Sequence, residues 1–128
     1  MTKAKILVVD DDPDFIYYTR TVLEGAEYGV LSAGNSDQGM LVLTREQPDL
    51  VILDVIMSSV LDGLSMSQQM ASNPALRHVP IIMVSSIANT DYAMLFPTDE
   101  SIHIDAFLTK PVAPAELLRQ IAQLLPPV

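Results

Sequence analysis

The sequence predicts an α/β fold: a three-layer α/β/α sandwich around a five-stranded parallel sheet. Five short apolar runs recur along the chain, and stretches with helical spacing separate them. The runs at 6–9, 50–53 and 81–84 are unbroken rather than alternating with polar residues, which is typical of strands buried on both faces, as in parallel sheets. The alternation of strands and helices predicts that helices cover both faces of the sheet.

The expected strands are short and rich in β-branched residues. They cover residues 6–9, 30–33, 50–53, 81–84 and 104–108. The first and third read ILVV and LVIL, whereas the second, VLSA, is weaker because it contains a serine. Apolar runs of this length between turn signals favour strands over helices.

Start and stop signals predict the helices. Asp12 followed by Pro13 indicates an N-cap and a first helical position, and Ser36 is expected to cap a second helix that ends near Gln47. A third helix is expected over about 64–71, and a weak fourth over 90–96. The last helix is the clearest, because an apolar stripe follows its opening proline. That helix opens at Pro114, and its stripe is Leu117, Leu118, Ile121, Leu124 and Leu125.

Length and composition indicate one domain and exclude several classes of protein. The 128 residues fit a single domain with its core over 5–125, and no output domain is expected. Seven Lys and Arg against sixteen Asp and Glu give a net charge of −9, which argues against a nucleic-acid partner. Cysteine is absent, which excludes thiol catalysis. Without a membrane-length apolar segment or a signal peptide, the expected protein is cytoplasmic and has no membrane partner.

Polar residues follow four of the expected strands. Because the carboxyl ends of parallel strands meet at one edge, where α/β sheets bind ligands, we expect these residues to lie close together. They are Asp10, Asp11 and Asp12 after the first strand, Asp54 after the third, Ser85 and Ser86 after the fourth, and Thr109 and Lys110 after the fifth.

Clustered carboxylates need a cation, and ligation by oxygen alone suits Mg²⁺ or Mn²⁺ rather than zinc. A hydroxyl and an ammonium suit phosphoryl oxygens, so the set predicts phosphoryl transfer onto a carboxylate. Each residue alone has an ordinary explanation, such as a helix cap for Asp12 or a strand-end turn for Asp54. Their joint occurrence at successive strand ends favours the functional interpretation.

Four segments, ILVVDDDP, DLVILDVIM, PIIMVSS and DAFLTKPV, resemble the signature blocks of response-regulator receiver domains. The resemblance spans residues 5–125 and implies a flavodoxin-like, doubly wound sheet with strand order 2-1-3-4-5. It also implies a two-component phosphorelay in which Asp54 is phosphorylated. Asp10 and Asp11 would hold Mg²⁺ together with Asp54 and the main-chain carbonyl of Ile56, and Asp11 would be the more direct ligand. Asp12 would lie outside the site and cap the first helix.

The resemblance assigns the remaining roles as well. Lys110 would pair with the phosphoryl oxygens, and its bond to the following proline would be cis. Ser85 would be the switch hydroxyl and Phe107 the aromatic switch residue, which, without a hydroxyl, can act only by packing. Isoleucines at 56 and 87, beside the path of an attacking water, imply slow self-dephosphorylation. The chain departs from the family pattern in the loop after Asp54 and in a long stretch before Phe107. The long stretch belongs to the surface through which receiver domains usually contact their downstream partners, so the resemblance implies an unusual choice of partner.

Three functions compete at this point. The leading hypothesis is a phosphotransfer switch, not an enzyme, which receives its phosphoryl group from a histidine kinase or histidine phosphotransfer protein. It would act on an unknown downstream protein as a monomer or weak dimer. A phosphatase of the haloacid dehalogenase type fits Asp10-x-Asp12, but Pro13 and the absence of a later acidic pair and of a cap argue against it. A receiver-like module that takes no phosphate is disfavoured by the intact Asp11, Asp54, Ser85 and Lys110.

Overall fold

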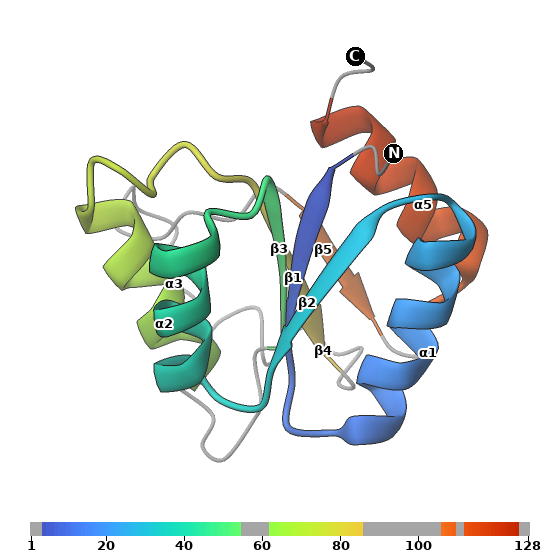
Figure 1. Ribbon diagram of the computed structural model, residues 1–128, viewed down its shortest axis with the longest axis horizontal. Helices are drawn as coiled ribbons and strands as arrows, with labels where there is room; N and C mark the ends of the chain where they lie inside the picture. The colour runs from blue at the N-terminus through green and yellow to red at the C-terminus, as the bar shows by residue number, and fades with distance from the viewer. Residues whose placement is uncertain (1–3, 55–61, 86–105, 110–111, 126–128) are drawn as a thin grey trace.

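The computed structural model describes residues 4–54, 62–85, 106–109 and 112–125. Within these ranges, five parallel strands form one sheet in the order β2-β1-β3-β4-β5, and helices cover both of its faces (Figure 1). The elements are β1 (Lys5–Val9), α1 (Pro13–Gly25), β2 (Gly29–Ala33), α2 (Ser36–Glu46), β3 (Leu50–Asp54), α3 (Asp62–Ser72), β4 (Ile81–Ser85), β5 (Ala106–Thr109) and α5 (Pro114–Leu124). The predicted fold class and strand order are confirmed. The weak helix expected over 90–96 lies outside the described residues.

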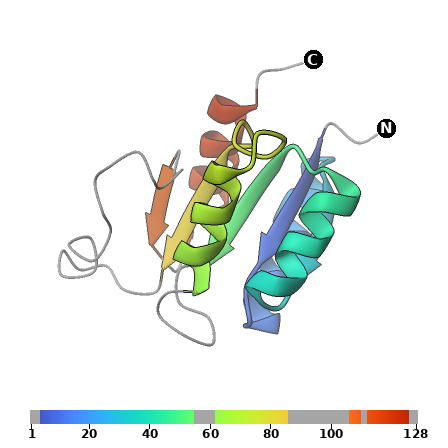
Figure 2. The ribbon, with the colours of Figure 1, turned by 90° about the vertical axis from the view of Figure 1, so that its left-hand side faces the viewer.

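The apolar strands contribute side chains to two separate hydrophobic cores, one on each face of the sheet. Odd-numbered residues of β1 and β3 pack with α2 and α3, while even-numbered residues of the same strands pack with α1 and α5. Figure 2 shows α2 and α3 in front of the sheet, on the face opposite α5. This arrangement follows from the two-residue period of a strand, which directs neighbouring side chains to opposite faces. β3 is therefore buried at every position, including its last residue, Asp54.

The helix starts agree with the sequence in one case and correct it in another. Asp12 caps α1 as predicted, since its Oδ1 accepts a hydrogen bond from the backbone N–H of Asp14 at 2.9 Å. The cap of α2 is Asn35 rather than Ser36, which is the first helical residue. Asn35 is extended, with φ of −159°, and accepts from the N–H of Gln38 at 2.8 Å. Both residue types cap helices well, so only the backbone conformation decides between neighbours.

The other helices begin or end within a few residues of their predicted bounds. α3 starts somewhat earlier than expected and ends just before Asn73-Pro74, and α5 opens at Pro114. Leu117 and Ile121 are the buried residues of the α5 stripe, and its other members are half-buried. None of the described helices has both the length and the apolarity that crossing a bilayer demands.

Two helical glycines should respond oppositely to alanine. Gly25, the last residue of α1, has open space where a Cβ would lie, so Gly25→Ala should raise the free energy of unfolding by about 0.5–1 kcal/mol. At Gly39 in α2 a Cβ would lie 3.0 Å from Met66 Sδ and 3.1 Å from Val9 Cγ2. Because Val9 belongs to a buried strand, Gly39→Ala should lose about 1 kcal/mol net. Urea unfolding measures both changes, and equal gains would show that the core around Gly39 yields freely.

Candidate functional site

Three carboxylates meet beyond the carboxyl ends of β1 and β3. Asp10, Asp11 and Asp54 each place one carboxylate oxygen within 4.8 Å of the others. The strand register explains why, since Val9 pairs with Leu53 and the next residue of each strand is an aspartate. The cluster therefore joins residues far apart in the sequence, as the strand-end argument predicted.

The environment of the three acids differs. Asp10 is fully buried and Asp54 is 5% exposed, whereas Asp11 is exposed. The main chain holds Asp10 in place, because its N–H donates to Ala33 O at 3.0 Å and its Oδ1 accepts from the N–H of Asp12 at 2.9 Å. The site therefore has two buried acids in a rigid setting and one acid open to solvent.

Asp12 is not a member of this cluster. Its carboxylate accepts a hydrogen bond from the first turn of α1, as described above. Its N–H donates to Asp10, so the start of α1 is tied to the acidic cluster through the backbone. The prediction that Asp12 caps the helix and lies outside the site agrees with this geometry.

The cluster has the chemistry of a site for a hard cation. Two like charges about 5 Å apart repel by ~1 kcal/mol in water and by several times more in a partly buried setting. Mg²⁺ prefers oxygen ligands about 2.0–2.1 Å from the ion, so the oxygens of one coordination shell lie about 3–4 Å apart. Oxygens already within 4.8 Å of one another need only small side-chain rotations to converge on such an ion.

The structure brings the backbones of further predicted site residues to the same edge. Asp54 pairs with Val84, so Ser85, the last residue of β4, follows directly beside it. Ser85 in turn pairs with Thr109, the last residue of β5, which precedes Lys110 in the chain. The predicted residues Ile56, Ser86, Ile87, Lys110 and Pro111 lie outside the described residues, and Phe107 is described only as a backbone position in β5. Their roles stay predictions.

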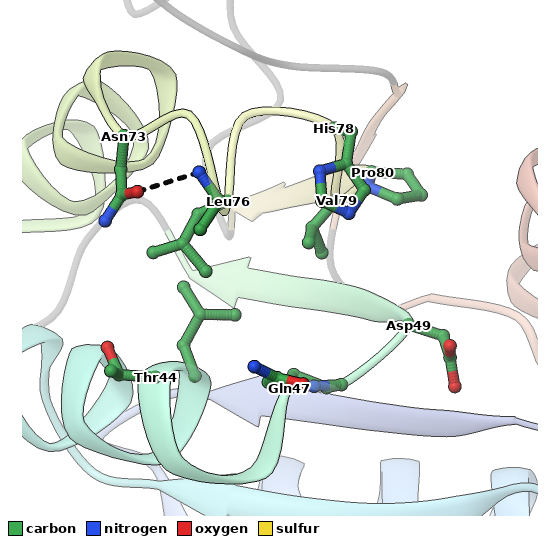
Figure 3. Close-up of a pocket in the computed structure, with 11 residues that line it drawn as sticks. Thr44, Gln47, Asp49, Asn73, Leu76, His78, Val79 and Pro80 are labelled. Atoms are coloured by element: carbon green, nitrogen blue, oxygen red, sulfur yellow. Dashed lines mark hydrogen bonds between the residues drawn. The ribbon is translucent and has the colours of Figure 1, made fainter.

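One cavity lies away from this site, at the opposite end of the strands. It has a volume of about 450 Å³ and lies between the carboxyl end of α2, the start of β3 and the loop before β4 (Figure 3). Its lining includes Leu43, Leu76, Gln47, Asn73 and His78. No acid of the cluster contributes to it, and no motif in the sequence marks these residues as a group.

A contact that the sequence analysis missed ties α1 to the segment before α5. The hydroxyl of Tyr18 donates to the main-chain carbonyl of Val112 at 2.6 Å, across 94 residues of chain. Its neighbour Tyr17 is 74% exposed. No signal in the sequence identifies the Val112 carbonyl as the partner of this hydroxyl.

A doubly wound parallel sheet that gathers acids beyond the ends of β1 and β3 defines a flavodoxin-like α/β domain with a cation-compatible site. The model of one family, the response regulator receiver domain, matches residues 6–122. The chain belongs to this family, and the predicted resemblance is confirmed.

Relatives and solved structures agree with this assignment. The chain is 30% identical over 122 residues to Protein PilH of Pseudomonas aeruginosa, covering 95% of this chain and 98% of PilH. It is 35% identical over 123 residues to the probable transcriptional regulator ycf27 of Pyropia yezoensis, covering 96% of this chain and 48% of that protein. It therefore spans about half the length of several curated relatives it matches, the ycf27 proteins among them.

Among solved structures, the signal receiver domain of a histidine kinase from Syntrophus aciditrophicus has a TM-score of 0.83 and 27% identity, with 95% of this chain and 89% of that chain covered. A putative response regulator from Chloroflexus aurantiacus has a TM-score of 0.85 at 24% identity, with 96% and 98% of the two chains covered, and it supports the fold.

Proposed function

We propose that this receiver domain accepts a phosphoryl group on Asp54 in a two-component phosphorelay. The observation that carries the proposal is the position of Asp54: it ends the central strand β3, is almost fully buried, and lies against Asp10 and Asp11. A carboxylate that is held by the sheet yet borders the strand-end edge suits a nucleophile. The donor would be the phosphohistidine of a histidine kinase or of a histidine phosphotransfer protein.

The transfer needs no redox chemistry. A carboxylate oxygen of Asp54 attacks phosphorus in line, the new O–P bond forms, and the N–P bond breaks with its electron pair returning to the donor imidazole. The rigid strand end fixes the direction of attack, because Asp54 is the last residue of a strand paired on both sides. Positioning of this kind accounts for much of the catalysis in phosphoryl transfer.

The donor set fits Mg²⁺, or Mn²⁺ in its place. Asp10, Asp11 and Asp54 would hold it, with the main-chain carbonyl of Ile56 as a further ligand. When bound, the ion neutralises the mutual repulsion of the carboxylates and the charge of the incoming phosphoryl group. The protein contributes the arrangement: Asp10 and Asp11 follow β1, Asp54 ends β3, and the pairing of the two strands sets their spacing.

Lys110, Ser85 and Phe107 complete the proposed switch. The Lys110 ammonium and the Ser85 hydroxyl would bind phosphoryl oxygens, and Phe107 would gain burial as Ser85 is drawn toward Asp54. The strand pairing supports this proposal, since Asp54, Ser85 and Thr109 follow one another across β3, β4 and β5. Phosphorylation would thereby alter the surface that binds a downstream protein. The domain would assist its own phosphorylation without turning over a separate substrate.

Intact mass spectrometry after incubation with acetyl phosphate and Mg²⁺ tests this function. One phosphoryl mass should be added with Mg²⁺ and none with excess chelator. An unmodified chain under both conditions would instead support a receiver-like module that takes no phosphate. Sustained release of p-nitrophenol from p-nitrophenyl phosphate would instead identify a phosphatase.

A further inference from the structure

One edge of the sheet is formed by β2, and the outer side of this strand is open to pairing. Among the described strands β2 pairs with β1 alone, and it lies between α1 and α2 (Figure 1). Its register with β1 runs over all five residues without a bulge. Its sequence, GVLSA, contains neither a charged residue nor a proline. Edge strands usually carry one of these protections, and an edge without them favours the addition of another strand.

The backbone groups that could bind such a strand belong to Val30 and Ser32. At both ends of β2 the odd-numbered residues bond toward β1. Gly29 donates its N–H to a carbonyl just before β1 at 2.8 Å, and the Ala33 carbonyl accepts at 3.0 Å from the N–H just after β1. Successive residues of a strand direct their backbone groups to opposite sides. The N–H and C=O groups of Val30 and Ser32 therefore point away from the sheet.

A second copy of the same strand, running antiparallel, matches these groups. With a two-fold axis at Leu31, Val30 of each copy lies opposite Ser32 of the other. Such a pair in an antiparallel ladder exchanges an N–H···O bond in each direction, so all the outward backbone groups of the two residues find partners. Leu31 meets its own counterpart at the axis, where side chains approach most closely. Because Leu31 is only half-buried against the core of α2 and α3, this contact would bury more of its apolar surface.

Charged side chains beside β2 have the same symmetry. The Arg20 Nη2 of α1 donates to Ser32 Oγ at 3.2 Å, so the guanidinium lies at the open edge. α1 runs opposite to β2, because it connects two parallel strands. One helical turn from Arg20 to Glu24 advances ~6 Å, and two strand residues from Ser32 back to Val30 cover ~6.6 Å. Glu24 therefore lies level with Val30.

In the antiparallel pair, each Glu24 lies level with Arg20 of the other copy. Neither side chain forms an ion pair among the described residues. The chain has a net charge of −9, so two copies repel one another in most orientations. The β2 arrangement instead brings opposite charges together on both sides of the two-fold axis.

We propose that β2 is a self-association edge, through which two copies of this domain pair antiparallel about Leu31 into one continuous sheet. The partner is a second copy because both the outward backbone groups and the charges of Arg20 and Glu24 are complementary to themselves. The copies run in opposite directions, so their acidic clusters lie at opposite edges of the joined sheet and neither blocks the other. The interface is small, so the dimer is weak. The pairing does not depend on the proposed phosphorylation of Asp54.

Sedimentation equilibrium of the unphosphorylated protein tests the proposal through a charge exchange on α1. Concentrations from about 10 μM to about 1 mM cover weak association, and about 0.15 M salt screens the long-range repulsion. The parent should pass from monomer to dimer in this range. Arg20→Glu and Glu24→Arg should each raise the dissociation constant about five- to thirtyfold, because each turns two attractive pairs into repulsive ones. Glu24→Arg should do so although it lowers the net negative charge.

The double variant and a matched control separate local pairing from total charge. Arg20→Glu combined with Glu24→Arg restores opposite charges, so its dissociation constant should return to within about threefold of the parent. Arg77→Glu changes the net charge as much as Arg20→Glu does. Arg77 is exposed in the loop before β4, which β1 and β3 separate from β2, so this variant should associate like the parent.

Amide hydrogen exchange locates the interface. Exchange at Val30 and Ser32 should slow as the concentration rises from about 10 μM to about 1 mM, while Leu31, whose N–H faces β1, should exchange slowly at both. A parent protein that stays monomeric throughout the range overturns the proposal. A dimer that is insensitive to the charge reversals, or that the double variant does not restore, also overturns it. Equally fast exchange of Val30 and Ser32 at both concentrations would place the association on another surface and overturn it as well.

Discussion

Replacing Asp54 with asparagine is expected to abolish labelling by acetyl phosphate. The amide is nearly isosteric with the carboxylate, so packing at the end of β3 should persist, but the amide oxygen is a far weaker nucleophile. Asp54 is the acid of the cluster that ends the central strand, and its pairing with Val84 of β4 limits the freedom of its backbone. Intact mass and acid-labile phosphate should both fall to background in Asp54→Asn.

Asp49→Asn is a suitable control for this variant. Asp49 is an exposed acid just before the other end of β3, where its carboxylate accepts a hydrogen bond from the N–H of Lys5. This change removes the same charge far from the cluster, so labelling should stay at the parent level. Labelling of Asp54→Asn at the parent rate would show that another residue accepts the phosphoryl group.

Alanine substitutions at the neighbours Asp11 and Asp12 should have different effects, the first on Mg²⁺ affinity and the second on stability. Asp11→Ala removes a cluster carboxylate and should weaken Mg²⁺ binding at least about tenfold, since even in water a charge a few Å from the ion contributes about this much. It should also relieve repulsion, so the metal-free variant should unfold at a higher temperature than the parent. Asp12→Ala removes the cap of α1 and should cost about 0.5–2 kcal/mol of stability, with Mg²⁺ affinity nearly unchanged.

Thermal unfolding with and without Mg²⁺ measures both variants at once. Mg²⁺ should raise the unfolding temperature of the parent, because it binds only the folded state. Asp12→Ala should unfold at a lower temperature than the parent without Mg²⁺ and should show the same rise when Mg²⁺ is added. In Asp11→Ala, Mg²⁺ should raise the unfolding temperature much less. The assignment is wrong if Asp12→Ala loses the response to Mg²⁺ and Asp11→Ala keeps it.

Much of this domain could be predicted from local sequence. Unbroken apolar runs such as 50–53 are long enough for a strand and too apolar for an exposed one, so they specify a sheet buried on both faces. Asp12-Pro13 specifies a helix start because each residue acts within the first turn. The edge of the sheet that carries the site also followed from the sequence, because all parallel strands end on the same side.

The tertiary structure alone decided how these parts meet. The sequence predicted that Asp10 and Asp54 share one edge of the sheet, but their spacing follows from the pairing of Val9 with Leu53, and a helix or strand signal carries no information about such a register. The choice of Asn35 over Ser36 as a cap depended on one backbone torsion, which the packing of α2 decides. The bond from Tyr18 to Val112 joins residues 94 positions apart, and it forms because α1 and α5 share one face of the sheet. Local patterns act over a few residues, whereas distances between side chains at the site depend on contacts across the whole chain.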